Sequence, residues 1–274
     1  MKNIDPATVA SFGDEWSRFD QQAMPEHEAK QVFEEYFAVF PWPALPENAE
    51  GFDMGCGSGR WSRWVAPKVG WLHCIDPSDA IDVAKANLSS FDNLTFHRAS
   101  VDQQCLPPAS QDFGYSLGVL HHVPDTLAAI RSCADLLKPG APLLLYLYYA
   151  FDNRRWWFRA LWRCSEVGRR LICNMPPWLK HTVTDVIALL IYFPIATSSR
   201  ILGKIGLNVA DIPLSYYRNH SFYTMRTDAR DRFGTPLEHR FTRQQIKKMM
   251  EDAGLENIRF SDSAPFWCAV GVKR

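Results

Sequence analysis

The stretch Phe-Asp-Met-Gly-Cys-Gly-Ser-Gly-Arg, residues 52–60, decides the fold of this 274-residue chain. An apolar start followed by Gly55, Gly57 and Gly59 is typical of a strand that turns sharply into a helix. Glycines in such a turn let the backbone approach a ligand where side chains would clash. The third glycine comes one position too early for the dinucleotide pattern Gly-x-Gly-x-x-Gly, and no Gly-Lys-Ser/Thr follows. The spacing therefore disfavours a nicotinamide dehydrogenase and excludes a P-loop protein.

Short apolar segments alternate with helical segments around this loop. Strands are expected at 50–54, 71–75, 94–99, 113–120 and 142–149, with helices from about 59, at 78–88 and at 126–137. Such alternation predicts parallel strands joined by crossover helices. The tail continues it, because Thr242 can cap a helix that ends at Gly254, and strands at 256–261 and 266–272 follow. We expect a doubly wound α/β fold with a mostly parallel, seven-stranded sheet.

Two parts of the chain have a different character. Residues 25–40 place a row of apolar side chains on one helical face before Pro41 and Pro43 end the helix. We expect residues 1–45 to form an N-terminal helical cap, and residues 46–151 with 241–274 to form the α/β core. Residues 152–240 would then be a mostly helical insertion. This insertion would serve as a substrate lid or an interaction surface.

Composition and charge exclude several classes of protein. The chain has 30 basic and 30 acidic side chains, which argues against a nucleic-acid binder. Its longest apolar run, 186–196, contains Pro194 and is too short to span a bilayer, which needs roughly 20 residues. The N-terminus has no signal-peptide pattern, and the seven cysteines lack zinc-site spacing. We expect a cytoplasmic protein with reduced thiols and no metal site.

Asp76 follows the strand 71–75, about 20 residues beyond the glycine loop, where a carboxylate can accept both hydroxyls of a ribose. The ligand of such a fold lies outside the carboxyl ends of the strands, where the strand order reverses. Taken alone, the glycines could form a plain turn and Asp76 could cap a helix. Together, at this spacing, they favour a ligand site.

Four segments together resemble the class I S-adenosylmethionine-dependent methyltransferases, particularly a small-molecule branch that includes quinone-biosynthesis enzymes. They are Phe-Asp-Met-Gly-Cys-Gly-Ser-Gly-Arg-Trp (52–61), Ile-Asp-Pro-Ser (75–78), Asp-Phe-Gly-Tyr-Ser-Leu-Gly-Val-Leu-His-His-Val-Pro-Asp (112–125) and Leu-Leu-Lys-Pro-Gly (136–140). With the tail, the resemblance covers about two thirds of the chain. It implies a methyltransferase with a Rossmann-like core whose cofactor is S-adenosyl-L-methionine.

The resemblance also implies a cofactor site. Asp53 would hold the amine side of the methionine through the loop or a water, and Asp76 would bind the ribose. Ser100 stands where the family usually has an aspartate that contacts the adenine amine, and the Val101 backbone would supply a neighbouring contact. Leu117 would offer its carbonyl to the methionine ammonium. The whole set comprises Asp53, Gly55, Cys56, Gly57, Gly59, Asp76, Pro77, Ser100, Val101 and Leu117.

His121 and His122 follow the fourth expected strand, at the edge of the sheet where the methyl group should lie. Histidine has a suitable pKa for a general base, although one imidazole could simply pack beneath the loop or cap the next helix. Tyr146, Tyr148 and Tyr149 end the fifth strand. One of them should line the acceptor pocket, and the others should pack in the core or at an interface. In the N-terminal cap, Trp16 and Phe19 would either cover the cofactor site or have an ordinary packing role.

The insertion opens with residues 154–173, a helix with arginines on one side and apolar side chains on the other. A second apolar helix follows from Trp178 to about Gly203, interrupted at Pro194. These helices could form a lid or homodimer surface with packed apolar faces, a peripheral membrane contact through 154–206, or a site for an anionic substrate. The candidate substrate residues are Tyr217, Arg218, His220, Tyr223 and Arg226.

Three functions are compatible with this pattern. The first is methyl transfer to an oxygen, nitrogen or carbon nucleophile of a small anionic or aromatic metabolite. The second is methylation of a quinone, lipid or glycan intermediate at the membrane surface. The third is a non-catalytic partner protein that binds S-adenosylmethionine.

Overall fold

The computed structural model describes residues 2–274, and the chain divides into two compact units. The first comprises Met1–Gln21, Ala29–Asp152 and Leu237–Arg274, and the second comprises Gln22–Glu28 and Asn153–Pro236. The core therefore resumes at Leu237, four residues before the expected boundary. Gln22–Glu28, expected within the N-terminal cap, belongs to the second unit.

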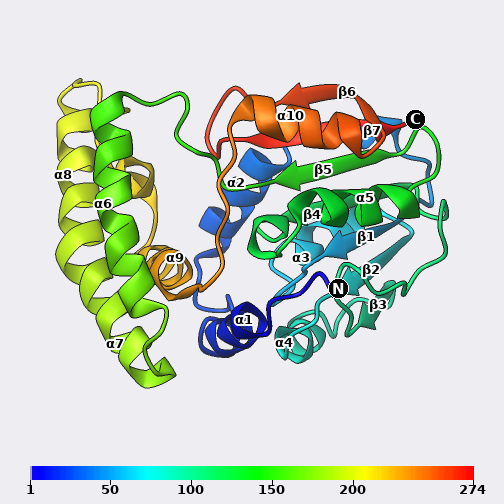
Figure 1. Ribbon diagram of the computed structural model, residues 1–274, viewed down its shortest axis with the longest axis horizontal. Coiled ribbons are helices and arrows are strands. Elements are labelled where there is room, and N and C mark those ends of the chain that lie inside the picture. Colours follow the sequence, from blue (N-terminus) through cyan, green and yellow to red (C-terminus); the bar gives the residue numbers. More distant parts are fainter. Residues whose placement is uncertain (1) are drawn as a thin grey trace. The chain divides into compact units, whose positions relative to one another are not determined.

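The first unit is built on a seven-stranded sheet (Figure 1). Its strands are β1 (Glu50–Met54), β2 (Trp71–Ile75), β3 (Leu94–His97), β4 (Phe113–Leu117), β5 (Pro142–Tyr146), β6 (Leu255–Phe260) and β7 (Cys268–Lys273). They lie in the order β3-β2-β1-β4-β5-β7-β6, and only β7 runs antiparallel to its neighbours. This confirms the doubly wound, mostly parallel sheet. The strand order reverses between β1 and β4, so the loops after these two strands flank the switch point.

Helices cover both faces of this sheet. They are α1 (Pro6–Arg18), α2 (Glu26–Tyr36), α3 (Ser62–Val65), α4 (Ala80–Asn87), α5 (Thr126–Leu136) and α10 (Arg243–Asp252), with 3-10 turns η1 (Trp42–Ala44), η2 (Ala66–Lys68) and η3 (Leu120–His122). Thr242 caps α10 as expected, because its hydroxyl accepts from the Gln245 backbone N–H while the Gln245 side chain accepts from Thr242.

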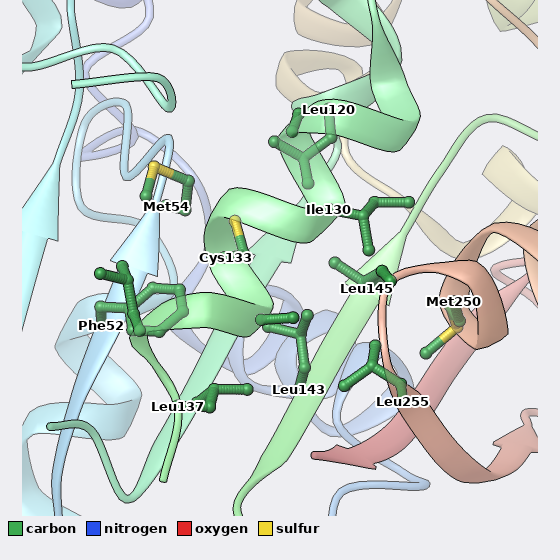
Figure 2. Close-up of a cluster of buried hydrophobic side chains, with 14 of the residues drawn as sticks. Phe52, Met54, Leu120, Ile130, Cys133, Leu137, Leu143, Leu145, Met250 and Leu255 are labelled. Carbon is green, nitrogen blue, oxygen red and sulfur yellow. The ribbon is translucent and has the colours of Figure 1, made fainter. Parts of the chain in front are cut away.

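Alternation along the strands divides the core into two clusters. Figure 2 shows the first, in which Phe52 of β1 and Leu143 of β5 pack against Ile130 of α5 and Met250 of α10. The second cluster joins Phe113 and other side chains of the opposite face to α2, α3 and α4. β4 is shorter than expected and ends at Leu117, because Gly118 adopts φ +81° and turns the chain out of the sheet.

The second unit is helical (Figure 1). Its elements are α6 (Trp156–Ile172), α7 (Pro177–Ile187), the π-helical segment η4 (Ala188–Tyr192), α8 (Phe193–Lys204), the 3-10 segment η5 (Ser215–Asn219) and α9 (Phe222–Gly234). From Pro177 to Lys204 the chain forms one helix of 28 residues. The helix expected from Trp178 to about Gly203 is therefore present, and by length and composition it could cross a bilayer. The expected interruption at Pro194 was wrong, since Pro194 falls in the first turn of α8 and leaves the helix unbroken.

α9 is the centre of the second unit and contacts α6, α7 and η4. Its N-terminus is held by the buried carboxylate of Glu28, which accepts from the Ser221 backbone N–H at 3.0 Å and the Thr224 hydroxyl at 2.6 Å. Glu28 therefore completes the end of a helix that follows it by almost 200 residues. This contact accounts for the place of Gln22–Glu28 in the second unit.

Candidate functional site

The glycine loop follows β1, and each glycine has a positive φ: +82° at Gly55, +53° at Gly57 and +80° at Gly59. A Cβ on Gly55 would lie 2.4 Å from the side chain of Val119, which follows β4. The loops after β1 and β4 are thus in direct contact. Glycine is required here both by the backbone and by the space.

Replacing Gly55 with alanine should lower the free energy of unfolding by about 3 kcal/mol, because the backbone is strained and the methyl group meets Val119. Gly140 provides a matched control, with φ +84° and nothing within 4 Å of a built Cβ. Gly140→Ala should cost only about 1 kcal/mol, the price of the left-handed backbone alone. Urea denaturation of both variants checks this. Equal losses would contradict the close approach of the two loops.

Asp76 holds the glycine loop. Its Oδ2 accepts from the Gly57 backbone N–H at 3.0 Å, while Oδ1 accepts from the Ser78 backbone N–H at 2.8 Å and the Ser78 hydroxyl at 2.6 Å. Burial raises the pKa of this carboxyl, opposed by the hydrogen bonds from Ser78 and Gly57. The structure therefore shows Asp76 supporting the turn, but it does not cap α4, whose N-cap is Asp79 with no side-chain cap hydrogen bond.

Asp53 lies beneath the loop and is fully buried. Its Oδ2 accepts from the Ser62 hydroxyl at 2.6 Å. Oδ1 has no hydrogen bond of normal geometry among residues 2–274, although the Tyr115 hydroxyl lies close enough to lower the pKa of Asp53. Burial outweighs these donors and raises that pKa to about 7. A buried carboxylate oxygen without a donor is suited to a cationic ligand group.

Ser100 follows β3, and its hydroxyl donates to Asp102 Oδ1 at 2.5 Å. Asp102 Oδ2 accepts from the Asn3 backbone N–H at 2.8 Å. The hydrogen bond from Ser100 is the main cause that lowers the pKa of Asp102, which keeps this carboxyl ionised. The Ser100 hydroxyl thus contacts the carboxylate of Asp102, two residues further on, which sequence reasoning did not single out. Cys56, Pro77, Val101 and Leu117 lie in the same set of loops and strand ends.

α1 covers part of this edge. A Cβ on Gly57 would lie 3.2 Å from the indole nitrogen of Trp16. The ring of Phe12 lies 4.9 Å from that of His122. Trp16 therefore packs directly on the glycine loop.

His121 and His122 lie in η3, directly after β4. His121 is fully buried, and neither of its ring nitrogens has a hydrogen-bond partner among residues 2–274. Its ring stacks on Tyr148 with 3.9 Å between centroids. Burial, and then the neighbouring His122, Arg240 and His239, lower the pKa of His121 well below its usual value. The imidazole is therefore neutral at neutral pH, and its burial beside Arg240 makes it a weaker base than a free histidine.

His122 is held in a fixed orientation. Its Nδ1 lies 2.6 Å from the carbonyl oxygen of Leu237, which can only accept, so a neutral His122 carries its proton on Nδ1. Its ring centroid lies 4.0 Å from that of His121. The two imidazoles and Tyr148 form one aromatic cluster at the carboxyl end of β4.

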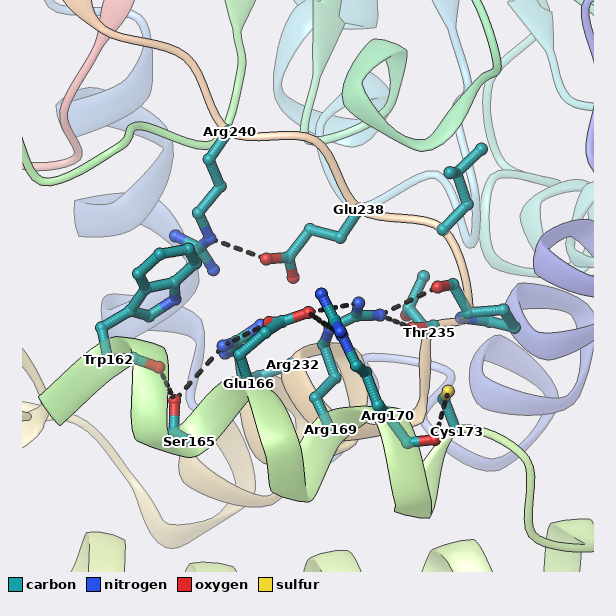
Figure 3. Close-up of polar contacts among 12 residues, drawn as sticks. Trp162, Ser165, Glu166, Arg169, Arg170, Cys173, Arg232, Thr235, Glu238 and Arg240 are labelled. Carbon is teal, nitrogen blue, oxygen red and sulfur yellow. Dashed lines mark hydrogen bonds and ion pairs between the residues drawn. The ribbon is translucent and has the colours of Figure 1, made fainter. Parts of the chain in front are cut away.

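The segment Leu237–Phe241 completes this cluster and was missed by sequence reasoning, which assigned most of it to the insertion. The His239 backbone N–H donates to the His121 carbonyl at 2.9 Å. Arg240 lies 4.9 Å from the centre of the Tyr148 ring, and its Nε donates to Glu238 at 2.6 Å (Figure 3). The site thus carries a largely buried arginine, paired with Glu238, beside the histidine pair.

The structure separates the two candidate tyrosines. Tyr148 joins His121, whereas Tyr149 lies near Phe266 and Trp267, in the cluster around α5 and α10. In the second unit, the Tyr217 hydroxyl donates to Asp228 at 2.8 Å, and Arg226 makes two hydrogen bonds to Asp185. The other candidates there are Arg218 and His220, which contact carbonyls of η5, and Tyr223 of α9. These contacts hold the second unit together.

Comparison with known proteins identifies the family. The model of a methyltransferase domain matches residues 52–145. The ubiquinone biosynthesis O-methyltransferase of Xanthomonas campestris pv. campestris (strain B100) is 35% identical over 181 residues, which are 65% of this chain and 72% of that protein. The chain belongs to the class I S-adenosylmethionine-dependent methyltransferases. It is an enzyme of the kind that uses S-adenosylmethionine.

Other proteins similar to this chain are also described as methyltransferases. The ubiquinone biosynthesis O-methyltransferase of Sodalis glossinidius is 25% identical over 194 residues, 68% of this chain and 74% of that protein. Among solved structures, an S-adenosylmethionine-dependent methyltransferase of Thermotoga maritima, described as a possible histamine N-methyltransferase, has a TM-score of 0.51 at 13% identity. That likeness covers 96% of this chain and all of the other, and it shows the fold alone.

Proposed function

We propose that this methyltransferase transfers the methyl group to a hydroxyl oxygen of a small acceptor bound against His121 and Tyr148. The observation that carries the proposal is the buried, neutral imidazole of His121. Leaving a buried polar group without a partner is costly, so an acceptor hydroxyl that donates to it would relieve the cost. The relatives named as O-methyltransferases support oxygen as the acceptor atom.

The residues around the glycine loop fit the cofactor. Asp53 Oδ1 would accept from the methionine ammonium, Asp76 from the ribose hydroxyls, and Asp102 with Ser100 from the adenine amine. When bound, S-adenosylmethionine supplies a methyl group on a sulfonium, which a nucleophile can take. The protein's part is to orient the acceptor and to remove its proton.

His121 would take the proton of the acceptor hydroxyl. Since its pKa is well below the usual value, the imidazole is already neutral over the physiological pH range. His122 would keep the pair in place through its bond to the Leu237 carbonyl. Arg240, beside Tyr148, would favour an acceptor with negative charge, including the oxyanion that forms as the proton leaves.

A panel of acceptors tests this function. Phenols and catechols, matched amines and matched thiols should be offered with S-adenosylmethionine, with S-adenosylhomocysteine as the measured product. We expect turnover with hydroxyl acceptors and little with the others. Methylation of amines alone would refute the assignment of oxygen. Tight cofactor binding without turnover on a broad panel would favour a binding protein.

Cofactor binding should release a proton near neutral pH. The pKa of Asp53 is about 7 in the folded protein, compared with an ordinary value of 3.8. Between these two pH values the unfolded state has lost the proton and the folded state still holds it, so the free energy of unfolding falls as pH rises. A bound ammonium favours the ionised carboxylate, so affinity for S-adenosylmethionine should rise with pH through this range. Titration calorimetry in buffers of different ionisation enthalpy measures the release.

Two controls sharpen this measurement. Methylthioadenosine has the adenosine but no amino acid, so its binding should show little proton release. Asp53→Asn cannot ionise and should abolish the pH dependence. Equal proton release with both ligands would place the titrating group elsewhere.

A further inference from the structure

Exposed apolar side chains are concentrated in the second unit. Among residues 2–274, every large apolar side chain that is exposed lies there, except Trp71. Trp156, Trp178, Leu190 and Ile205 are each at least 66% exposed. The expected apolar face of α6 is also open, since Val167 is 64% exposed. Such an accumulation on a soluble protein marks a surface that meets another apolar phase or partner.

The long helix Pro177–Lys204 is buried on one side only. Thr184, Ala188, Tyr192 and Ala196 are buried, whereas just 22% of its most apolar window is buried, with a mean hydropathy of 1.7. α9, on its inner side, carries Arg226, which pairs with Asp185 of the long helix. A helix that crossed a bilayer here would carry this charged neighbour into the hydrocarbon. One apolar face opposite one protein-bound face suits a helix that lies in the plane of the interface.

The exposed charges of this surface all have one sign. Between residues 154 and 207 there are two acidic side chains, Glu166 and Asp185, and both are paired inside the unit. Figure 3 shows Glu166 between Arg169 and Arg232. The exposed charged side chains over this range are Arg155, Arg159, Arg163, Arg170, Arg200 and Lys204. The rest of the chain must compensate them, because the formal net charge is zero.

We propose that α6 and the outer face of Pro177–Lys204 dock on an anionic phospholipid surface. The apolar side chains enter the outer part of the bilayer, while the six cations meet the lipid phosphates. Trp156 and Trp178, both exposed, have the amphipathic rings that favour this depth. A second copy of the chain fits this face less well, because it would bring two sets of cations together. Docking needs neither catalysis nor an acceptor, so it stands apart from the proposed function.

Flotation of the full-length protein with vesicles tests the proposal. Vesicles of phosphatidylcholine with phosphatidylglycerol should bind it, and phosphatidylcholine alone should bind it at least tenfold more weakly. Arg159, Arg163 and Lys204 are exposed and form no ion pair among residues 2–274, so their joint change to glutamine should spare the fold. Each cation near the surface is worth about fivefold in binding, so the triple variant should bind roughly a hundredfold more weakly. High salt should reduce wild-type binding.

Matched variants define the outcomes. Lys68, Lys247 and Lys248 are exposed cations of the first unit, and their joint change to glutamine should leave vesicle binding within twofold. Leu190→Ser with Ile205→Ser should abolish binding to anionic vesicles without lowering Tm, because both side chains are exposed. Equal loss in both charge variants would overturn the proposal. The proposal would also be overturned if the wild-type protein bound no vesicles and formed a dimer that the serine variant dissociates. It would equally be overturned if neither salt nor carbonate released the bound protein from the vesicles.

Discussion

Asp76→Ala is expected to weaken S-adenosylmethionine binding by at least about a hundredfold. Each hydrogen bond to a charged group contributes about 1.5–3 kcal/mol. The variant loses both carboxylate oxygens that are proposed to accept from the ribose hydroxyls. It also releases the Gly57 and Ser78 backbone N–H groups, so the glycine loop loses its support. Calorimetric titration measures the affinity. Thermal unfolding should show a simultaneous loss of stability of about 1–3 kcal/mol.

Two variants separate the ligand contact from the support of the loop. Asp76→Asn keeps one acceptor and the side-chain shape, so it should restore most of the stability but not the affinity. Asp79→Ala serves as the control, because this neighbouring carboxylate is exposed and pairs with Arg98 instead. Affinity within twofold of wild type in a folded Asp76→Ala protein would remove Asp76 from the cofactor site.

His121→Asn is expected to lower kcat by about 10²- to 10⁴-fold, the usual contribution of a general base. Cofactor affinity should stay within about twofold, because no cofactor contact is assigned to this ring. The free energy of unfolding should fall by about 1–3 kcal/mol, since the variant loses the buried ring stacked on Tyr148 and buries an amide in its place. Single-turnover kinetics and thermal unfolding measure the two effects.

The acceptor itself supplies the control for His121. A phenol of low pKa is already ionised near neutral pH and needs no base, so His121→Asn should lose far less rate with it than with an ordinary phenol. The wild-type rate should keep its full value down to well below pH 6.5, because the pKa of His121 is lowered. An equal loss of rate with both phenols would make His121 a positioning residue rather than the base.

The parts of this enzyme that the sequence predicted depend on local patterns. The strands around residues 52–60, the glycine loop and the Thr242 cap each involve neighbours within a few positions, where periodicity and capping chemistry can be seen directly. Strand ends were less certain, as at Leu117, because a single glycine conformation decided them. Asp53 and Asp76 lie beside the glycine loop as expected.

The missed features depend on contacts between distant parts of the chain. Arg240 meets Tyr148 across about 90 residues, and nothing in the local sequence marks that approach. Asp102 was missed because the family pattern marks position 100, and nothing in the sequence indicates that the Ser100 hydroxyl donates to Asp102. Whether the apolar face of α6 is covered could not be predicted for a similar reason. Periodicity defines an apolar side, but only the partner helices decide which side is covered.

Glu28 has a consequence for how this enzyme could be re-engineered or could have diversified. Because this carboxylate holds the start of α9, the helical unit draws on two separate stretches of the chain. Grafting residues 153–236 into another scaffold would leave Ser221 and Thr224 without their acceptor. Excising the same residues would leave the Glu28 carboxylate without its two donors. The unit is therefore not a removable cassette. Recombination that preserves it must carry the short segment before Ala29 along with it.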